Sequence, residues 1–352
     1  MTAVRQALVL VGGRGTRMWP LTAECPKPLL PLAGVPFLEL QLRQIAAAGV
    51  EEAVLAVGGE DLAAFEDFAA GRTEGPDIRF VVEEERLDTA GPVVAALDTL
   101  DERFLVLNGD VIVETDLSDY LARSPEGAAG TLALVRVEDT SAYGVVVTAD
   151  DGTVQRFVEK PPPEKAPADT VNAGIYVMSR RAFEGYDAGA LSFERVVFPA
   201  LAERGELAAL VVEGRWIDIG TPPSYLDATA ALLRGESRLH HPEPAVLIAE
   251  TARIEGTVEG PWAWVADEAW VEEGATVTRS VLLPGARVAS GAAVSDAIVG
   301  WEAVVGEGSI VRGHSMIGPR ATIGSGCEID HGARIAPDVV LPHGAVTFTA
   351  PE

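Results

Sequence analysis

A six-residue repeat in the last third of the chain limits its possible folds more than any other feature. Eight aliphatic residues recur at this interval without a slip: Val299, Val305, Val311, Ile317, Ile323, Ile329, Ile335 and Leu341. Four positions after each stands a small or β-branched residue: Ala303, Ser309, Ser315, Ala321, Cys327, Ala333, Val339 and Ala345. An α-helix repeats every 3.6 residues and a strand every two, so neither explains a period of six. A parallel β-helix does, because each hexapeptide turns one apolar side chain inward.

The same pattern continues upstream with a few one-residue slips. Its members there are Ile248, Ile254, Val265, Val271, Val277, Val288 and Val294. Ordinary short strands joined by glycine turns would not keep eight hexads in phase. We therefore predict a parallel β-helix domain over residues 247–352, in which three hexads per coil divide residues 246–346 into between five and six coils.

The first 235 residues show a different alternation, in which short β-branched apolar stretches are separated by helical patterns. The predicted strands are Ala7–Val11, Ala53–Val57, Ile78–Val82 and Phe104–Leu107. The predicted helices are Phe37–Ala48, Asp61–Ala70, Ala90–Leu100, Ser192–Arg204 and Pro222–Arg234. This alternation is typical of a Rossmann-like, doubly wound α/β domain with a mostly parallel sheet, here over residues 1–235. An antiparallel hairpin is predicted from Tyr143–Thr148 and Val154–Glu159, and the polar stretch 236–246 is the predicted linker.

Charge and composition exclude several classes of protein. With 53 acidic and 27 basic residues the net charge is −26, which leaves no basic face for the phosphates of a nucleic acid. Cys25 and Cys327 cannot form a disulfide framework, so a reducing compartment is the simplest interpretation. The apolar run Ala7–Val11 is too short for a signal peptide, and no run approaches the ~18 residues of a membrane helix. We expect a cytoplasmic protein that binds neither nucleic acid nor membrane.

The segment Leu8–Pro31, LVLVGGRGTRMWPLTAECPKPLLP, carries the clearest chemical signal. Its glycines follow a predicted first parallel strand, where they let backbone N–H groups approach a phosphate or a base. Arg17 and Lys27 place two cations in one loop, which suits a polyphosphate. Lys27 is the more informative of the two because the chain has only three lysines and 24 arginines. The loop is no P-loop, since no Lys-Ser/Thr follows the glycines, and Met18 breaks the dinucleotide fingerprint.

Two carboxylates and a second lysine also stand at strand ends. Asp110 follows the predicted strand Phe104–Leu107, and Asp218 lies in WIDIGTP just before a predicted helix. Two carboxylates that converge on a phosphate site are typical Mg²⁺ ligands, although Asp110 alone could equally be a turn or helix-cap residue. Lys160 follows the strand Val154–Glu159, where a mobile ammonium suits a terminal phosphate. The alternative for Lys160 is a solvated charge at a strand end.

Together these motifs resemble the sugar-1-phosphate nucleotidylyltransferases, or NDP-sugar pyrophosphorylases, whose signature is GGxGTRL-x-PLT…PKPL-x-P. Further matches to the family follow in the expected order: Asn108-Gly109-Asp110, Tyr143–Val146, Val158–Pro161, Asn172–Tyr176 and Trp216–Pro222. The resemblance is strongest to the mannose-1-phosphate guanylyltransferases, through Leu10–Gly13, Glu83-Glu84-Glu85 before Leu87, and Phe193–Pro199. It covers the whole of residues 1–235, and it implies that the hexapeptide tail is a left-handed β-helix.

The resemblance also implies which residues form the site. Those implied to bind the nucleotide are Val11, Gly12, Gly13, Gly15, Thr16, Arg17, Glu83, Asp88, Thr89 and Asn108. Those implied to bind the sugar phosphate are Gly144, Glu159, Lys160, Asn172 and Gly174. The implied catalytic residues are Arg17, Lys27, Asp110, Lys160 and Asp218, with Mg²⁺ on Asp110 and Asp218. In the implied reaction a sugar 1-phosphate attacks the α-phosphorus of a nucleoside triphosphate, and no nucleophilic side chain is needed because the phosphate is already an anion.

The nucleotide preference depends on Glu83, which the resemblance places at the Watson–Crick edge of the base. Guanine presents two adjacent donors there, and one carboxylate can accept both, whereas it would oppose the carbonyls of uracil or thymine. We therefore expect GTP, with mannose 1-phosphate as the acceptor. Use of dTTP, UTP or ATP, or of a glucose, heptose or cyclitol phosphate, stays open. Asp88 departs from the family, which usually has Gly there, and its charge should repel a triphosphate unless it turns outward or joins the metal site.

Two other classes of function stay open. Hexapeptide β-helices also occur in acyltransferases, which use a His base, but this tail has no evident extra loop to cover an acceptor. The five histidines, His240, His241, His314, His331 and His343, show no metal-ligand spacing. A non-catalytic regulatory paralogue that binds an NDP-sugar could lose a cation or a carboxylate, whereas all five catalytic positions are filled here. We expect an enzyme that forms a homo-oligomer through the exposed faces and ends of its β-helix.

Overall fold

The computed structural model describes residues 4–141, 143–162, 165–240 and 244–347. The chain folds into two compact units, and each is discontinuous in the sequence. The first unit consists of Met1–Gly13 and Leu38–Ile217, and the second of Arg14–Phe37 and Asp218–Glu352. The linker predicted at 236–246 includes residues 241–243, which lie outside the described residues.

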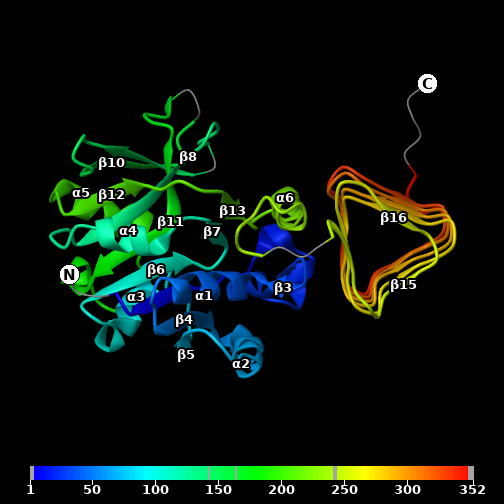
Figure 1. Ribbon diagram of the computed structural model, residues 1–352, viewed down its shortest axis with the longest axis horizontal. Coiled ribbons are helices and arrows are strands. Elements are labelled where there is room, and N and C mark those ends of the chain that lie inside the picture. Colours follow the sequence, from blue (N-terminus) through cyan, green and yellow to red (C-terminus); the bar gives the residue numbers. More distant parts are fainter. Residues whose placement is uncertain (1–3, 142, 163–164, 241–243, 348–352) are drawn as a thin grey trace. The chain divides into compact units, whose positions relative to one another are not determined.

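A nine-stranded mixed sheet is the centre of the first unit (Figure 1). Its strands are β1 (Gln6–Leu10), β4 (Glu52–Gly58), β5 (Asp77–Glu83), β6 (Arg103–Asn108), β8 (Gly130–Arg136), β9 (Gly144–Thr148), β10 (Val154–Glu159), β11 (Thr170–Ser179) and β12 (Leu207–Val211). They lie in the order β10-β9-β11-β6-β1-β4-β5, with β8 beside β11 and β12 beside β8. The four strands that the sequence predicts, β1, β4, β5 and β6, are parallel neighbours, and β9 and β10 form the predicted antiparallel hairpin. Both predictions are confirmed.

Strands β8, β11 and β12 have no counterpart among the predicted strands. Because β11 runs antiparallel to both β6 and β8, it makes the sheet mixed rather than parallel throughout. Its register with β8 shifts between Asn172 and Tyr176, around Gly174 with a φ of 78°. Such an irregularity breaks the alternation of side chains by which a strand is recognised in a sequence.

Five α-helices belong to the described part of this fold before residue 217: α1 (Phe37–Ala47), α2 (Leu62–Ala70), α3 (Gly91–Ala96), α4 (Leu117–Arg123) and α5 (Phe198–Glu203). The helix predicted over Ser192–Arg204 begins instead as a π-helical turn, Phe193–Val197, and only then continues as α5. Pro199 has no N–H for an α-helical bond to residue 195, which favours the wider turn. That turn packs Phe193 against Tyr176 on β11, with ring centroids 5.3 Å apart.

The second unit contains a parallel β-helix, which Figure 1 shows end-on as a stack of triangular coils in yellow to red. The first sheet comprises β14 (Val246–Ile248), β17 (Ala263–Val265), β20 (Val281–Leu282), β23 (Ile298–Val299), β26 (Met316–Ile317) and β29 (Arg334–Ile335). The second comprises β15 (Arg253–Ile254), β18 (Trp270–Val271), β21 (Arg287–Val288), β24 (Val304–Val305), β27 (Thr322–Ile323) and β30 (Val340–Leu341). The third comprises β16 (Thr257–Glu259), β19 (Thr276–Thr278), β22 (Ala293–Ser295), β25 (Ile310–Val311) and β28 (Glu328–Ile329). The prediction of between five and six coils is confirmed.

The hexad residues form the interior of the β-helix. Val299, Val305, Val311, Ile317 and Ile323 are fully buried, and so are the small residues Ala303 and Ala321 at the corners. Their side chains stack from coil to coil into one continuous apolar column, which stabilises a domain whose strands are only two or three residues long.

Two shorter elements complete the second unit besides the β-helix. The hairpin β2 (Pro31–Leu32) and β3 (Val35–Pro36) closes the segment Arg14–Phe37, and α6 (Pro222–Leu233) begins at a capping box formed by Thr221 and Ser224. The Tyr225 hydroxyl of α6 donates a hydrogen bond to the backbone oxygen of Pro31. No helix in the described part of the chain is both long and apolar enough to cross a membrane.

Candidate active site

The first part of the candidate site lies where the loop that follows β1 approaches Glu83, the last residue of β5. The backbone N–H groups of Val11 and Gly12 donate to the oxygen of Ala56, at 3.2 and 2.9 Å. A Cβ at Gly12 would lie only 2.7 Å from Glu83 Oε1, so only glycine lets the Glu83 carboxylate lie this close to the loop. The structure therefore brings together Gly12 and Glu83, which are 71 positions apart in the predicted nucleotide site.

The Glu83 carboxylate is half-buried and held by the turn that follows it. Its Oε2 accepts the N–H of Leu87 at 3.2 Å. Burial raises the pKa of Glu83, because a charged carboxylate loses solvation there, while the bond from Leu87 and the charge of Arg86 oppose the shift. Hydrogen-bond donors on a ligand could therefore replace part of the solvation that the Glu83 carboxylate loses through burial.

Asp88 and Thr89 follow in the same turn and are tied to the π-helical turn. Asp88 has a φ of 60°, a left-handed conformation that favours glycine. Its Oδ1 accepts the N–H of Thr89 at 2.9 Å, and its Oδ2 forms an ion pair with Arg195. The Thr89 hydroxyl donates to Glu194 at 2.8 Å and accepts the N–H of Phe193 at 2.9 Å. The charge of Asp88 is thus compensated within the protein.

In the second unit, Gly15 allows the loop with Arg17 and Lys27 to fold on itself. Gly15 has a φ of 55°, and a Cβ there would lie 2.8 Å from Thr22 Cγ2 and 3.2 Å from Lys27 Cβ. The Thr22 hydroxyl donates to the Gly15 oxygen at 3.0 Å. Arg17 lies in the 3₁₀ turn Thr16–Met18 and is exposed, whereas Lys27 is half-buried. The loop therefore presents both cations from one compact stretch of backbone.

Gly220 brings Arg17 and Asp218 close to each other in the same unit. The Gly220 N–H donates to Asp218 Oδ1 at 2.6 Å. A Cβ at position 220 would lie 2.7 Å from Asp218 Oδ1 and 2.8 Å from Arg17 Nη2. The glycine of WIDIGTP is therefore needed for close approach rather than for an unusual backbone conformation.

The turn that carries Asp110 is fixed from two sides in the first unit. The Gly109 N–H donates to the Leu10 oxygen at 2.9 Å, and a Cβ at Gly109 would lie 2.6 Å from that oxygen. Gln41, fully buried on α1, donates from Nε2 to the backbone oxygens of Asn108 at 2.8 Å and of Val111 at 2.7 Å. Sequence reasoning missed Gln41. A lone amide on the buried face of a helix was the only signal that could have found it.

The two predicted metal carboxylates stand at the ends of paired strands. Asp110 directly precedes β7 (Val111–Val113), and Asp218 is the last residue of β13 (Trp216–Asp218), which pairs with β7. Among the described residues no group of three or more His, Cys, Asp or Glu is assembled for a metal. Oxygen donors from one or two carboxylates suit Mg²⁺, which takes its remaining ligands from substrate phosphates and water. These residues therefore fit a metal that arrives with its nucleotide.

The predicted sugar-phosphate residues cluster around β11 and the β9–β10 hairpin. Asn172 accepts the Gly174 N–H at 3.0 Å and donates to the Tyr176 hydroxyl at 2.9 Å. Burial raises the pKa of Tyr176, so this hydroxyl stays protonated. A Cβ at Gly174 would lie 3.0 Å from Asn108 Nδ2, which joins this group to the turn of Asp110. Tyr176 is a second residue that sequence reasoning missed.

The hairpin places the remaining sugar-phosphate residues through its backbone. In its register Gly144 pairs with Glu159, so the two positions lie opposite each other on β9 and β10. The Lys160 N–H donates to the Tyr143 oxygen at 3.1 Å, and Lys160 itself is exposed with a φ of 44°. The structure thus brings together three of the predicted positions at one end of the hairpin.

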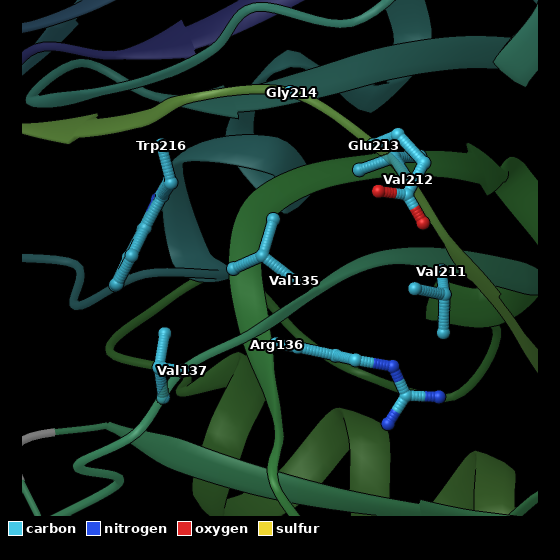
Figure 2. A pocket seen from close by; sticks show the side chains of 8 residues that line it. All are labelled: Val135, Arg136, Val137, Val211, Val212, Glu213, Gly214 and Trp216. Carbon is cyan, nitrogen blue, oxygen red and sulfur yellow. The ribbon is translucent and has the colours of Figure 1, made fainter.

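A pocket of about 320 Å³ lies elsewhere in the first unit, at the carboxyl ends of β8 and β12 (Figure 2). Its lining residues are Val135, Arg136, Val137, Val211, Val212, Glu213, Gly214 and Trp216. Figure 2 shows the side chains of Arg136 and Glu213 at its polar side, opposite Trp216. None of the predicted site residues lines this pocket.

Comparisons with known proteins show which families the two parts of the chain match. A family model described as nucleotidyl transferase matches residues 6–235, and one described as GMPPB C-terminal domain matches residues 242–318. The mannose-1-phosphate guanyltransferase of Schizosaccharomyces pombe is 38% identical over 260 residues, which cover 72% of this chain and 70% of that protein. The mannose-1-phosphate guanylyltransferase of Mycobacterium tuberculosis is 40% identical over 245 residues, with coverages of 68% and 67%.

Solved structures also resemble part of this chain in fold. HddC from Yersinia pseudotuberculosis superposes with a TM-score of 0.57 at 27% identity, covering 64% of this chain and 98% of HddC. A second structure of HddC, complexed with GMP-PN, gives a TM-score of 0.56 at 26% identity. Both cover about the length of the first 235 residues.

Proposed function

The chain belongs to the nucleotidyl transferase family, and we propose that it transfers a GMP group from GTP to a sugar 1-phosphate. The proposed acceptor is mannose 1-phosphate, so that the products are GDP-mannose and pyrophosphate. Two relatives that carry the name mannose-1-phosphate guanyltransferase or guanylyltransferase match 72% and 68% of the chain, and a nucleotidyl transferase family model matches residues 6–235.

The observation that supports GTP as the nucleotide is that the Glu83 carboxylate lies beside Gly12. A base bound over the glycines would present its edge to this half-buried carboxylate. Guanine offers N1–H and a 2-amino group side by side, and the two oxygens of one carboxylate can accept both. Oε2 also accepts the Leu87 N–H, which fixes the orientation of the carboxylate and leaves a lone pair on that oxygen.

The chemistry needs no protein nucleophile. An oxygen of the sugar phosphate forms a bond to the α-phosphorus, and the bond from that phosphorus to the bridging oxygen breaks, so pyrophosphate leaves with the electron pair. Arg17 and Lys27, held together by the turn at Gly15, are the proposed cations for the charge that develops on pyrophosphate. Lys160 is the proposed anchor for the acceptor phosphate, and Asn172 a donor or acceptor for its hydroxyls. Holding both substrates in line can contribute ~7–11 kcal/mol to lowering the barrier.

Asp110 and Asp218 are the proposed ligands of a divalent metal, with Mg²⁺ as the expected ion. Asp110 directly precedes β7, and Asp218 is the last residue of β13. When bound, Mg²⁺ would neutralise charge on the substrate phosphates. Within the protein, Gln41 fixes the turn of Asp110, and Gly220 fixes the rotamer of Asp218 through its N–H.

The experiment that tests this function is a pyrophosphate-release screen of GTP, ATP, UTP and dTTP against mannose, glucose, heptose and cyclitol phosphates. We expect release with GTP and mannose 1-phosphate to exceed every other pair by at least ~10-fold in kcat/KM, since one base-edge mismatch costs about 1.5–3 kcal/mol. A preference for a pyrimidine nucleotide would contradict the role of Glu83. Binding of GDP-mannose without any pyrophosphate release would instead indicate a regulatory paralogue.

A further inference from the structure

The three sheets of the β-helix differ in what covers their outward faces. In the first sheet, the residue that precedes each inward-pointing residue points outward, and these residues stack into a column. Four members of the column are Trp264, Val281, Ile298 and Met316, whose exposed fractions are 4, 0, 0 and 0%. The corresponding columns of the second and third sheets include Val340, 70% exposed, and Ile310, 37% exposed. Within the described residues, the outward face of the first sheet is therefore more deeply buried at these four positions than the faces of the other two sheets at Val340 and Ile310.

The next residue in this column touches the loop of residues 14–37, which carries Arg17 and Lys27 and is called the phosphate loop below. Arg334 follows Met316 in the register of β26 with β29. Its Nη1 donates to the backbone oxygens of Trp19, at 3.3 Å, and Thr16, at 3.5 Å. These two oxygens flank Arg17, and loop and β-helix belong to the same compact unit.

A second arginine, Arg320, contacts the same loop near Lys27, through Glu24. Arg320 lies in the corner after β26, and its Nη1 donates to Glu24 Oε2 at 2.8 Å while its Nη2 bonds to the other oxygen of Glu24. Asp338, on the following coil, accepts from Nε at 2.8 Å and from Nη2 at 2.9 Å. Arg320 lowers the pKa of both Glu24 and Asp338, so both carboxylates stay charged at neutral pH.

We propose that the last two coils of the β-helix hold the phosphate loop in its working shape, with Arg320 and Arg334 as positioning residues. They act through Glu24 and through the backbone of Thr16–Trp19, and this inference rests on the proposed function for the roles of Arg17 and Lys27. A guanidinium that meets a carboxylate with both of its ends fixes orientation as well as distance. The family model for the C-terminal part matches residues 242–318, which include neither arginine.

The proposal predicts an effect on the nucleotide and not on the acceptor. A loop that shifts by a fraction of an ångström misplaces both cations relative to the triphosphate, whereas Lys160 and Asn172 lie in the other unit. The pair of Arg320 and Glu24 is about 40% exposed on both sides, so each single substitution should have a modest effect that salt weakens.

The test compares R320M, R334M and the double variant with R312M as the matched control. Arg312 makes the same kind of two-sided contact, to Asp330 and Glu328 at 2.6 Å each, but wholly inside the β-helix. We expect KM for GTP to rise ~3- to 5-fold in each single variant. In the double variant we expect a rise of about 10-fold, with KM for mannose 1-phosphate unchanged. In R312M, KM for GTP and KM for mannose 1-phosphate should both equal those of the wild type. Combining E24Q with R320M should add nothing to R320M alone, because both remove the same contact.

A second measurement needs no activity. Hydrogen exchange of the amides of residues 14–30 in the substrate-free protein should be faster in R320M than in R312M. If the wild type transferred no nucleotide at all, the proposed function would fail, yet this measurement would still test the contact. Equal exchange in the two variants would overturn the proposal, and so would faster exchange in R320M with an unchanged KM for GTP.

Discussion

Glu83 combines two properties at one residue, close approach to the glycine loop and an incompletely solvated carboxylate. We expect E83Q to lower kcat/KM for GTP by about 1.5–3 kcal/mol in transition-state terms, because an amide replaces one of the two acceptors that guanine needs. UTP and dTTP should gain relative to GTP. Steady-state kinetics with the three nucleotides measure this change, and an unaltered ranking would contradict base recognition by Glu83.

The same residue predicts a pH dependence. Burial raises the pKa of Glu83 in the free protein, and only the ionised form accepts both guanine donors. Protonation therefore competes with GTP, and kcat/KM for GTP should fall as the pH drops through this raised pKa, earlier than for an ordinary glutamate. A pH profile of the wild type against E83Q tests the assignment, since the variant should lack this phase.

Asp110 and Asp218 predict a dependence on divalent metal. D110N and D218N each remove one negative charge without changing shape, and we expect turnover to fall ~100-fold or more, the size typical of losing one group that stabilises transition-state charge. Chelating the divalent metal should abolish turnover of the wild type. Thermal unfolding should show that both variants stay folded. Full activity of either variant at low Mg²⁺ would count against its role as a ligand.

At the level of single residues, the sequence pointed to candidate positions but not to their contacts. Gly12, Glu83 and Asp88 were all assigned to the nucleotide, and the structure shows how Gly12 and Glu83 meet and how Arg195 compensates Asp88. That pairing spans more than 100 positions, and no local pattern reports which of the chain's arginines will face a given carboxylate.

Among the elements, α1 has a role that its amphipathic pattern does not show. Q41M would remove both hydrogen bonds to the turn of Asp110 and leave two buried carbonyls without donors, at a cost of about 1–3 kcal/mol in unfolding free energy. We expect it also to lower kcat more than the matched variant Q44M, because Gln44 bonds to the far end of β7, at Val113 and Thr115. Equal kcat in the two variants, at equal loss of stability, would show that Gln41 only stabilises the fold.

The hexads of the β-helix and the short apolar runs of β1, β4, β5 and β6 were predicted correctly. Strands β8, β11 and β12 were not predicted, and the helix over 192–204 was predicted with the wrong start. β11 is interrupted at Gly174, and the helix before α5 widens into a π-helical turn near Pro199. In both places a backbone feature of one or two residues overrides the propensity of the stretch around it.

For the whole molecule, the division into compact units is the least predictable result. The stretch Arg14–Phe37 belongs with the C-terminal residues although the sequence runs on from it into α1. Arg320 and Glu24 are 296 positions apart, so their ion pair leaves no local trace in the sequence. The predicted boundaries at 235 and 247 describe continuity along the chain, and they stay a prediction.

Truncation tests how much the catalytic part depends on the β-helix. We expect a chain cut after Arg238 to fold but to be less stable, because the loop of residues 14–37 loses Arg320 and Arg334. Its oligomeric state should also change, since flat β-helix faces suit self-association. Thermal unfolding and sizing of both forms measure this. A full-length chain that runs as a monomer at working concentration would rule out the assembly role.

The regular spacing of the coils also limits where such a chain can gain or lose residues. Successive strands of the first sheet lie 17 or 18 residues apart, and each coil advances the stack by ~4.8 Å. Deleting one coil before β26 would carry Arg320 and Arg334 a full strand spacing away from the loop, while adding coils after β30 would leave them in place. Descendants of this sequence should therefore gain repeats only at the carboxyl end of the β-helix, after β30, and keep the number of coils before it constant.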